Sequence, residues 1–294
     1  TNGDEVIVPD LTFIASSNSI IMAGATPVFA DVNKETFQIS PEEIEKNISN
    51  KTKAIMPVHL YGQSADMDAI MDIAKKYNLK IIEDAAQGVG VKFNGKHVGT
   101  FGEIGSLSFY GNKIITTGEG GLLLTNSEEL AKKVYVFKNH GREKKGIFIH
   151  DEIGYNFSFT EMQAAVGLSQ LSKFNKIKQR KDEIRKMYES GLSKIQQVKL
   201  SFIDPRCSPI HWFTNIIVPD AESLYQYLEK KEIQTRRFFY PLHLQPCYSY
   251  MNIQKKFPNS EYAYSHGLSL PSSYTLKDSE VQTVIKAIKE YYQK

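Results

Sequence analysis

Short apolar runs alternate with helix-like segments through the first half of the chain. The helix-like segment at 40–48 begins with Ser40 and Glu43, the spacing of a capping box, and has Pro41 in its first turn. Strands that alternate with helices are typical of a mainly parallel sheet, so the pattern predicts an α/β fold. We predict strands at 6–8, 27–32, 54–60, 79–82 and 122–124, and helices at 40–48, 66–77 and 127–137.

The second half of the chain has a different pattern. Ser158 and Glu161 repeat the capping-box spacing and predict a helix start, and a long, charge-rich helix is expected at about 171–195. This helix is typical of a connector between a large domain at 1–185 and a smaller C-terminal α+β domain at 186–294. In the smaller domain we predict strands at 198–203, 212–218 and 233–236, and helices at 221–230 and 278–292.

The composition of the 294-residue chain narrows its class and partners. A net charge of +3 is small for this length and favours neither nucleic acid nor a membrane surface as a partner. Two cysteines, Cys207 and Cys247, are too few for a disulfide framework, which predicts a reducing, cytoplasmic location. No apolar run approaches the ~20 residues of a spanning helix, and we expect no signal peptide and no metal site.

Lys113 lies in an unusual setting, among small, hydroxylated and glycine residues in the segment 108–121, SFYGNKIITTGEGG. A neutral lysine amine forms a Schiff base with an aldehyde cofactor, and partial burial favours the neutral amine. Ser106 and Ser108 offer hydroxyls to a phosphate, and glycines allow close approach of the backbone. Each feature alone has a simpler explanation, a solvated turn lysine and a tight turn before the next strand.

Asp84 follows the predicted strand at 79–82, and ligands of open α/β sheets bind beyond the carboxyl ends of the strands. A carboxylate there keeps a ring nitrogen protonated, and a pyridinium ring is an electron sink. Gln87 lies close enough in sequence to reach another polar edge of the ring, and Phe13 is placed to stack on a flat cofactor. The alternatives are a turn-capping aspartate and a core phenylalanine.

The combination of these features is much narrower than any one of them. With its Asp-x-x-Gln, Ser-x-x-x-x-Lys and glycine-rich turn, the chain resembles the pyridoxal-phosphate-dependent sugar aminotransferases of the DegT/DnrJ/EryC/StrS type, which have the aspartate-aminotransferase type of fold. It looks closest to the nucleotide-sugar 4-aminotransferases that make perosamine-type sugars for polysaccharides such as O-antigen. The resemblance extends to the segments GDEVIVP at 3–9, PVHLYG at 57–62, GYNFSFTE at 154–161 and FFYPLH at 238–243.

This resemblance implies roles for individual residues. Lys113 would hold pyridoxal phosphate as a Schiff base and shuttle protons, Asp84 would bind the pyridine nitrogen, and Gln87 the phenolic oxygen. Ser108 would bind the phosphate and Phe13 would cover one ring face. Asn156 would reach the cofactor phosphate of a neighbouring subunit, so a homodimer is expected. Cations and aromatic rings suit a nucleotide sugar, and the substrate-binding candidates are Tyr240, His243, Arg237 and His59.

The chain departs from this family in two places. The family has an earlier segment with a Ser-Gly-Thr turn whose backbone donors bind the cofactor phosphate, so we expect the large domain to lack its N-terminal portion here. The family also often has Tyr-Arg after the residue that corresponds to Asn156, where this chain has Phe157 and Ser158.

We therefore expect transfer of an amino group from L-glutamate to the 4-keto carbon of a nucleotide-linked 4-keto-6-deoxyhexose. On resemblance alone, GDP-4-keto-6-deoxymannose is the first candidate substrate, and the nucleotide and sugar stay open. The alternatives are a 3-aminotransferase, a sugar dehydratase and a cofactor-free scaffold. Related dehydratases have histidine at the position of Lys113, which disfavours that alternative.

Overall fold

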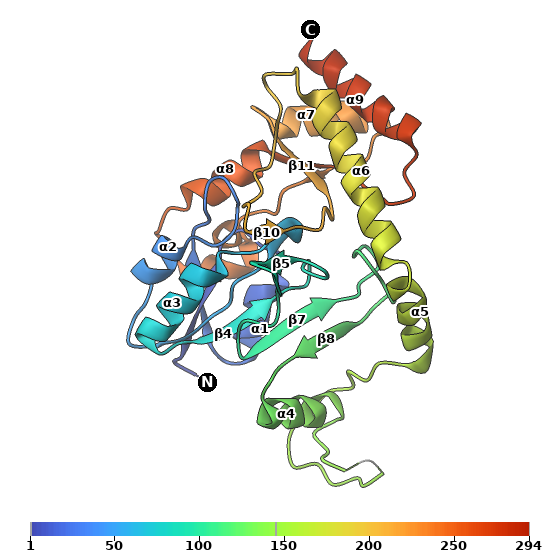
Figure 1. Cartoon of the computed structure of the whole chain (residues 1–294). Coiled ribbons are helices and arrows are strands. Elements are labelled where there is room, and N and C mark those ends of the chain that lie inside the picture. Colours follow the sequence, from blue (N-terminus) through green and yellow to red (C-terminus); the bar gives the residue numbers. More distant parts are fainter. Residues whose placement is uncertain (1, 145, 294) are drawn as a thin grey trace.

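The core of the protein is a six-stranded sheet in the order β2-β1-β3-β4-β7-β8, seen in the computed structural model, which describes residues 2–144 and 146–293 (Figure 1). Neighbours from β2 to β7 pair in parallel, and β8 pairs with β7 in the antiparallel sense. The expected mainly parallel α/β fold is confirmed. The strands are β1 Glu5–Pro9, β2 Thr26–Ala30, β3 Thr52–Ile55, β4 Lys80–Asp84, β7 Ile104–Ser108 and β8 Gly121–Leu124.

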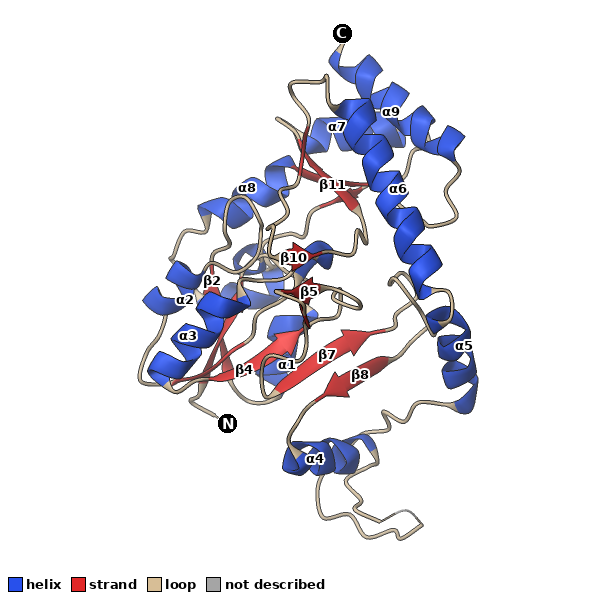
Figure 2. Ribbon diagram, viewed as in Figure 1, coloured by secondary structure: helices blue, strands red, loops and turns tan. Residues whose placement is uncertain are grey.

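Helices cover both faces of this sheet (Figure 2). Ile7 of β1 packs in a cluster with Ile70 of α3, whereas its neighbour Val8 packs in another cluster with Ile20 of α1. Successive strand residues point to opposite faces, so an apolar run without alternation is what a sheet buried on both sides requires. The helices here are α1 Ala15–Met22, α2 Pro41–Lys46 and α3 Met67–Tyr77, with a short turn η1 Leu60–Gly62.

One long helix, α6 Phe174–Leu192, contributes to two apolar clusters. Ile177 near its start packs with Ile114 after β7, and Tyr188 near its end packs in the core of the C-terminal part. The predicted domain boundary at 185 falls inside this helix and stays a prediction. The C-terminal elements are β9 Lys199–Leu200, β11 Thr214–Ile217, α7 Ala221–Glu229, β12 Arg236–Arg237, α8 Pro258–His266, β13 Gly267–Leu270 and α9 Asp278–Tyr292.

The C-terminal strands form a second sheet in the order β12-β13-β11-β9. A third, small sheet pairs two strands of the first half with one that follows α6. Within the described residues, no helix is long and apolar enough to cross a membrane, and no group of three metal-ligating side chains is present. The remaining elements are β5 Lys92–Phe93, β6 Lys96–His97, β10 Cys207–Ser208, η2 Leu242–Leu244 and η3 Pro246–Met251.

An arm extends from the β8 side of the main sheet. It contains α4 Glu128–Lys138, loop segments at 139–144 and 146–160, and α5 Glu161–Leu171, and Figure 1 shows the loop segments projecting away from the body. The predicted start of α5 at Ser158 is wrong by two residues, since Thr160 caps the helix and forms the capping box with Gln163. Neither α4 nor α5 has a buried residue.

Glu83 anchors the turn that follows the small hairpin β5–β6. Its fully buried carboxylate accepts hydrogen bonds from the backbone N–H groups of Gly99 (2.6 Å), Phe101 (2.6 Å) and Gly102 (2.8 Å). Burial alone would raise the pKa of Glu83, but these donors and His59 outweigh it and the pKa is lowered. The neighbouring Asp84 points to the opposite side of the strand. The two adjacent carboxylates therefore bind different groups.

We expect Glu83→Ala to lower the free energy of unfolding by about 3–5 kcal/mol, because it leaves several buried donors without an acceptor. Urea denaturation of the wild type and the variant measures this. Glu128→Ala, which removes an exposed glutamate on α4, is the matched control and should change stability little. Equal effects of the two substitutions would contradict the anchoring role of Glu83.

Candidate active site

The candidate site lies where parallel strands of the main sheet end side by side. Asp84 is the last residue of β4, and Lys113 lies in the connection from β7 to β8. β4 and β7 are neighbours, with Asp84 opposite Ser106. The carboxyl ends of these two strands therefore bring the predicted amine and carboxylate to one edge of the sheet.

The Lys113 amine is partly buried and interacts with two groups. Burial lowers the pKa of Lys113, the charge of Asp84 acts in the opposite direction, and the net pKa is lowered. Nζ lies 4.5 Å from the centroid of the Trp212 ring. The environment of Lys113 is therefore that of a held, desolvated amine and not that of a solvated turn lysine.

Asp84 is held firmly by its surroundings. Its carboxylate accepts a hydrogen bond from Ser16 Oγ at 2.6 Å and another from the Ala86 N–H at 3.0 Å. The turn-capping explanation is thus correct in part, but each carboxylate oxygen keeps a lone pair for a further donor. Ser16 was not among the sequence candidates. The available signal was the spacing of Thr12 and Ser16, whose hydroxyls lie 3.3 Å apart directly after β1.

Gln87 and Phe13 complete this edge. The Gln87 oxygen accepts from the Tyr61 N–H at 2.6 Å, which leaves the amide nitrogen as the group that can donate to a ligand. The Tyr61 ring stacks on Phe239 with an interplanar angle of 6°. Phe13 is 57% exposed, and its ring centroid lies 6.0 Å from that of Phe239. It is therefore a surface residue, and the alternative that Phe13 is a core phenylalanine is wrong.

Residues 1–289 match the family described as the DegT/DnrJ/EryC1/StrS aminotransferase family. The chain belongs to this aminotransferase family. It is 43% identical to GDP-perosamine synthase of Escherichia coli O157:H7 over 99% of this chain and 80% of that protein. It is 41% identical to dTDP-3-amino-3,6-dideoxy-alpha-D-galactopyranose transaminase of Aneurinibacillus thermoaerophilus, over 98% of this chain and 79% of that protein.

The solved structure of one relative matches the fold of this chain over its whole length. It is S. venezuelae DesV in complex with a ketimine intermediate, with a TM-score of 0.94 and 33% identity. The match covers 100% of this chain and 79% of that one. The resemblance that the motifs predicted is therefore confirmed at the level of family and fold.

Ser108, Gly118 and Gly120 shape the backbone around the connection between β7 and β8. Ser108 is partly buried, and its Oγ accepts weakly from the Tyr110 N–H at 3.3 Å, so its hydroxyl proton is still available to an anion. Gly118 adopts φ of 80°, and a Cβ on Gly120 would lie 2.5 Å from the Phe159 ring. The tight-turn explanation is correct for these two glycines.

His59 does not have the substrate-binding place that the sequence predicted. It is fully buried, its Nε2 lies 3.0 Å from Glu83 Oε2, and its Nδ1 accepts from the Ala65 N–H at 3.2 Å. Both ring nitrogens are thus occupied by the protein. The substrate-binding expectation for His59 is therefore wrong. Its ring binds the Glu83 carboxylate and the backbone N–H of Ala65, which lies just before α3.

His243 and Arg237 are also bound to protein groups. His243 Nδ1 lies 2.8 Å from Asp10 Oδ2, and its side chain is 8% exposed. Burial opposes the charge on this ring, but Asp10 outweighs it and the pKa of His243 is raised. The Arg237 guanidinium pairs with Glu222 and donates to a backbone carbonyl. Both substrate assignments stay predictions, and Tyr240, which is 39% exposed, is the most accessible of the substrate-binding candidates.

Asn156 lies apart from the other candidates, on the projecting loop of the arm. It is exposed and forms an isolated antiparallel bridge with Asn139. Such a place is compatible with a contact to another subunit, and that role stays a prediction.

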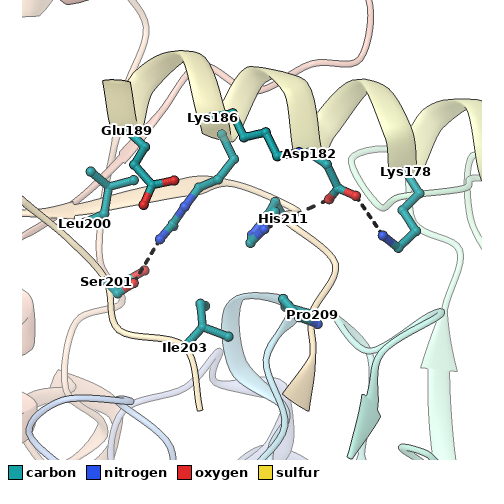
Figure 3. Close-up of a pocket in the computed structure, with 10 residues that line it drawn as sticks. Lys178, Asp182, Lys186, Glu189, Leu200, Ser201, Ile203, Pro209 and His211 are labelled. Atoms are coloured by element: carbon teal, nitrogen blue, oxygen red, sulfur yellow. Dashed lines mark hydrogen bonds and ion pairs between the residues drawn. The ribbon is translucent and has the colours of Figure 1, made fainter. Parts of the chain in front are cut away.

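A cavity of about 590 Å³ lies under α6, and neither Lys113 nor Asp84 is among the residues that line it (Figure 3). Two of its cations bind protein groups: Lys178 Nζ lies 2.7 Å from Asp182, and Arg185 donates to the Ser201 carbonyl at 3.0 Å. Burial lowers the pKa of His211 to about 4, so this ring is neutral at pH 7. Lys113 therefore stays the predicted reacting amine.

Proposed function

We propose that this aminotransferase binds pyridoxal phosphate at Lys113 and Asp84, and that it moves an amino group from L-glutamate to the 4-keto carbon of a nucleotide-linked 4-keto-6-deoxyhexose. The observation that carries the proposal is the desolvated Lys113 amine beside the Asp84 carboxylate. The relative named GDP-perosamine synthase, at 43% identity, supports the class of sugar.

The groups at the sheet edge fit this cofactor. Asp84 is an anion for a protonated ring nitrogen, the amide nitrogen of Gln87 is a donor for a phenolic oxygen, and the exposed Phe13 ring is a cover for one face. Ser108 offers a hydroxyl to the phosphate. When bound, pyridoxal phosphate supplies an electron sink for the substrate carbon next to the nitrogen.

Lys113 contributes the proton transfers. A lowered pKa increases the fraction of neutral amine near pH 7, and the neutral amine is both the attacking nucleophile and a general base. With the cofactor bound, the freed Lys113 Nζ would accept the proton of the substrate carbon next to the nitrogen and would return it during the transfer. Donor and acceptor substrates then react in turn at one site, so ping-pong kinetics follow.

The position of the aminated carbon is the finer part of the proposal. The relative at 41% identity carries a name that specifies a 3-amino sugar, so a 3-aminotransferase is the second candidate. The retained Lys113, Asp84 and Gln87 disfavour a cofactor-free scaffold. Nucleotide-linked substrates and two free cysteines, Cys207 and Cys247, suit a cytoplasmic enzyme.

We also propose that the working unit is a homodimer in which Asn156 serves the neighbouring site. The support is a group of exposed apolar side chains on β8, α5 and the projecting loop. Large surfaces of this kind typically mark interaction sites. Its members are Leu122, Leu123, Ile147, Phe148, Ile149, Ile153, Phe157, Val166, Leu168 and Leu171.

Pyridoxal phosphate should attach covalently to the wild type and give absorbance in the visible, and Lys113→Ala should lose this band. Because the pKa of Lys113 is lowered, attachment should fall as the pH drops through a midpoint below the 10.5 of an ordinary lysine. A titration of absorbance against pH measures both. Lys176→Ala, at an exposed lysine on α6, is the control. Attachment by Lys113→Ala with the wild-type spectrum would refute the assignment.

The product identifies the substrate and the carbon. We expect incubation with L-glutamate and a GDP-linked 4-keto-6-deoxyhexose to add an amino group at C4, found by mass and by NMR of the product. UDP- and dTDP-linked 4-keto sugars and a 3-keto sugar run in parallel as competitors. Amination at C3 supports the second candidate, and a deoxygenated product without nitrogen contradicts both.

Complementation tests the shared site. Lys113→Ala and Asn156→Ala should each be inactive alone, whereas a refolded equal mixture should regain about a quarter of wild-type activity, because half of the dimers are mixed and each has one intact site. Light scattering should give about twice the chain mass of 33.3 kDa. A monomer, or a mixture without recovery, speaks against the shared site.

A further inference from the structure

Lys181 is a buried cation whose acceptors are backbone carbonyls. It lies on α6 and is 7% exposed, and its Nζ donates to the carbonyls of Trp212 at 2.8 Å and Ser272 at 2.7 Å. Burial lowers the pKa of this amine to about 8. Burying an ammonium group that is not paired with a carboxylate costs stability. Packing alone therefore does not explain why a lysine is placed at position 181.

Trp212 connects this cation to the active site. Its carbonyl binds Lys181, and its indole Nε1 donates to the carbonyl of Asn112 at 2.7 Å, the residue directly before Lys113. The face of the buried ring lies 4.5 Å from Lys113 Nζ. One side chain is therefore fixed to α6 at its backbone and to the β7–β8 connection at its ring.

We infer that Lys181 is a positioning residue for Lys113 and acts through Trp212. By binding two carbonyls, one before β11 and one after β13, the Lys181 ammonium sets how deeply the indole packs against the Asn112–Lys113 backbone. The indole in turn excludes water from one side of the Lys113 amine and attracts its protonated form. This inference rests on the proposed function, in which Lys113 is the reacting amine.

The chain is well suited to a test because Trp212 is its single tryptophan, so the protein's indole emission reports this residue alone. Lys113 is followed separately by its labelling with trinitrobenzenesulfonate, mapped by peptide mass as a function of pH. Neither measurement needs pyridoxal phosphate. Covalent attachment of pyridoxal phosphate is then measured as a third, independent readout.

We expect Lys181→Met to red-shift the emission of Trp212 and make it more open to acrylamide quenching. The labelling midpoint of Lys113 should rise by about one pH unit, since water reaching the amine removes the dominant cause of its lowered pKa while Asp84 is unchanged. Lys181→Arg, which keeps the charge and the donors, should retain most of the wild-type values. Lys176→Met, at an exposed lysine of α6, should change nothing.

Trp212→Phe tests separately the second link of the inference, from the indole to Lys113, with Lys181 intact. It removes the indole donor and should raise the labelling midpoint of Lys113 in the same direction. Wild-type emission and midpoint in folded Lys181→Met, or a wild-type midpoint in Trp212→Phe, would overturn the inference. If the wild type attaches no pyridoxal phosphate but these shifts occur, the proposed function fails and the positioning role stands.

Discussion

The candidate site depends on the electrostatic interaction between one amine and one carboxylate at the edge of a parallel sheet. Burial lowers the pKa of Lys113 and the charge of Asp84 raises it. The net pKa of the amine is therefore set by the distance between the two groups and by their exposure to water. The sheet fixes this geometry because β4 and β7 are neighbouring parallel strands. A flexible surface pair would have neither the fixed distance nor the desolvation.

The rest of the structure keeps that edge in place. Glu83 holds the turn at 99–102 from the opposite side of β4, and Ser16 of α1 holds the carboxylate of Asp84. The long helix α6 reaches the other side of the site through Lys181 and Trp212. Three elements that are distant in the sequence therefore support two side chains, which is how an enzyme keeps its reacting groups in a fixed arrangement.

The sequence predicted elements where hydrophobic pattern and local caps agree. β1, β4 and α9 lie where they were expected, and α4 begins at Glu128, one residue after its predicted start at Ser127, which caps the helix. α1 was not predicted because two of its buried residues, Ser16 and Ser17, are polar and find their partners across the fold. The hydrophobic pattern of a short segment does not show which distant residues will bind its polar side chains.

The same limit applies to the site. Lys113, Asp84 and Gln87 were proposed because their spacing in the chain is characteristic, and the structure places Asp84 and Lys113 at the ends of neighbouring strands although β7 was not predicted. His59 was misassigned because a residue type shows what a side chain can bind but not that Glu83 already binds it. The contacts of His243 with Asp10 and of Arg237 with Glu222 could not be read from the sequence for the same reason. Trp212 was missed because it reaches Lys113 only through the packing of α6 and β11.

Reduction with borohydride in the presence of pyridoxal phosphate, followed by peptide mass mapping, tests whether Lys113 binds the cofactor beside Asp84. We expect the reduced cofactor on the peptide that contains Lys113, and we expect Asp84→Ala to weaken this labelling greatly. Labelling spread over exposed lysines, or labelling at Lys113 that is indifferent to Asp84, would contradict it.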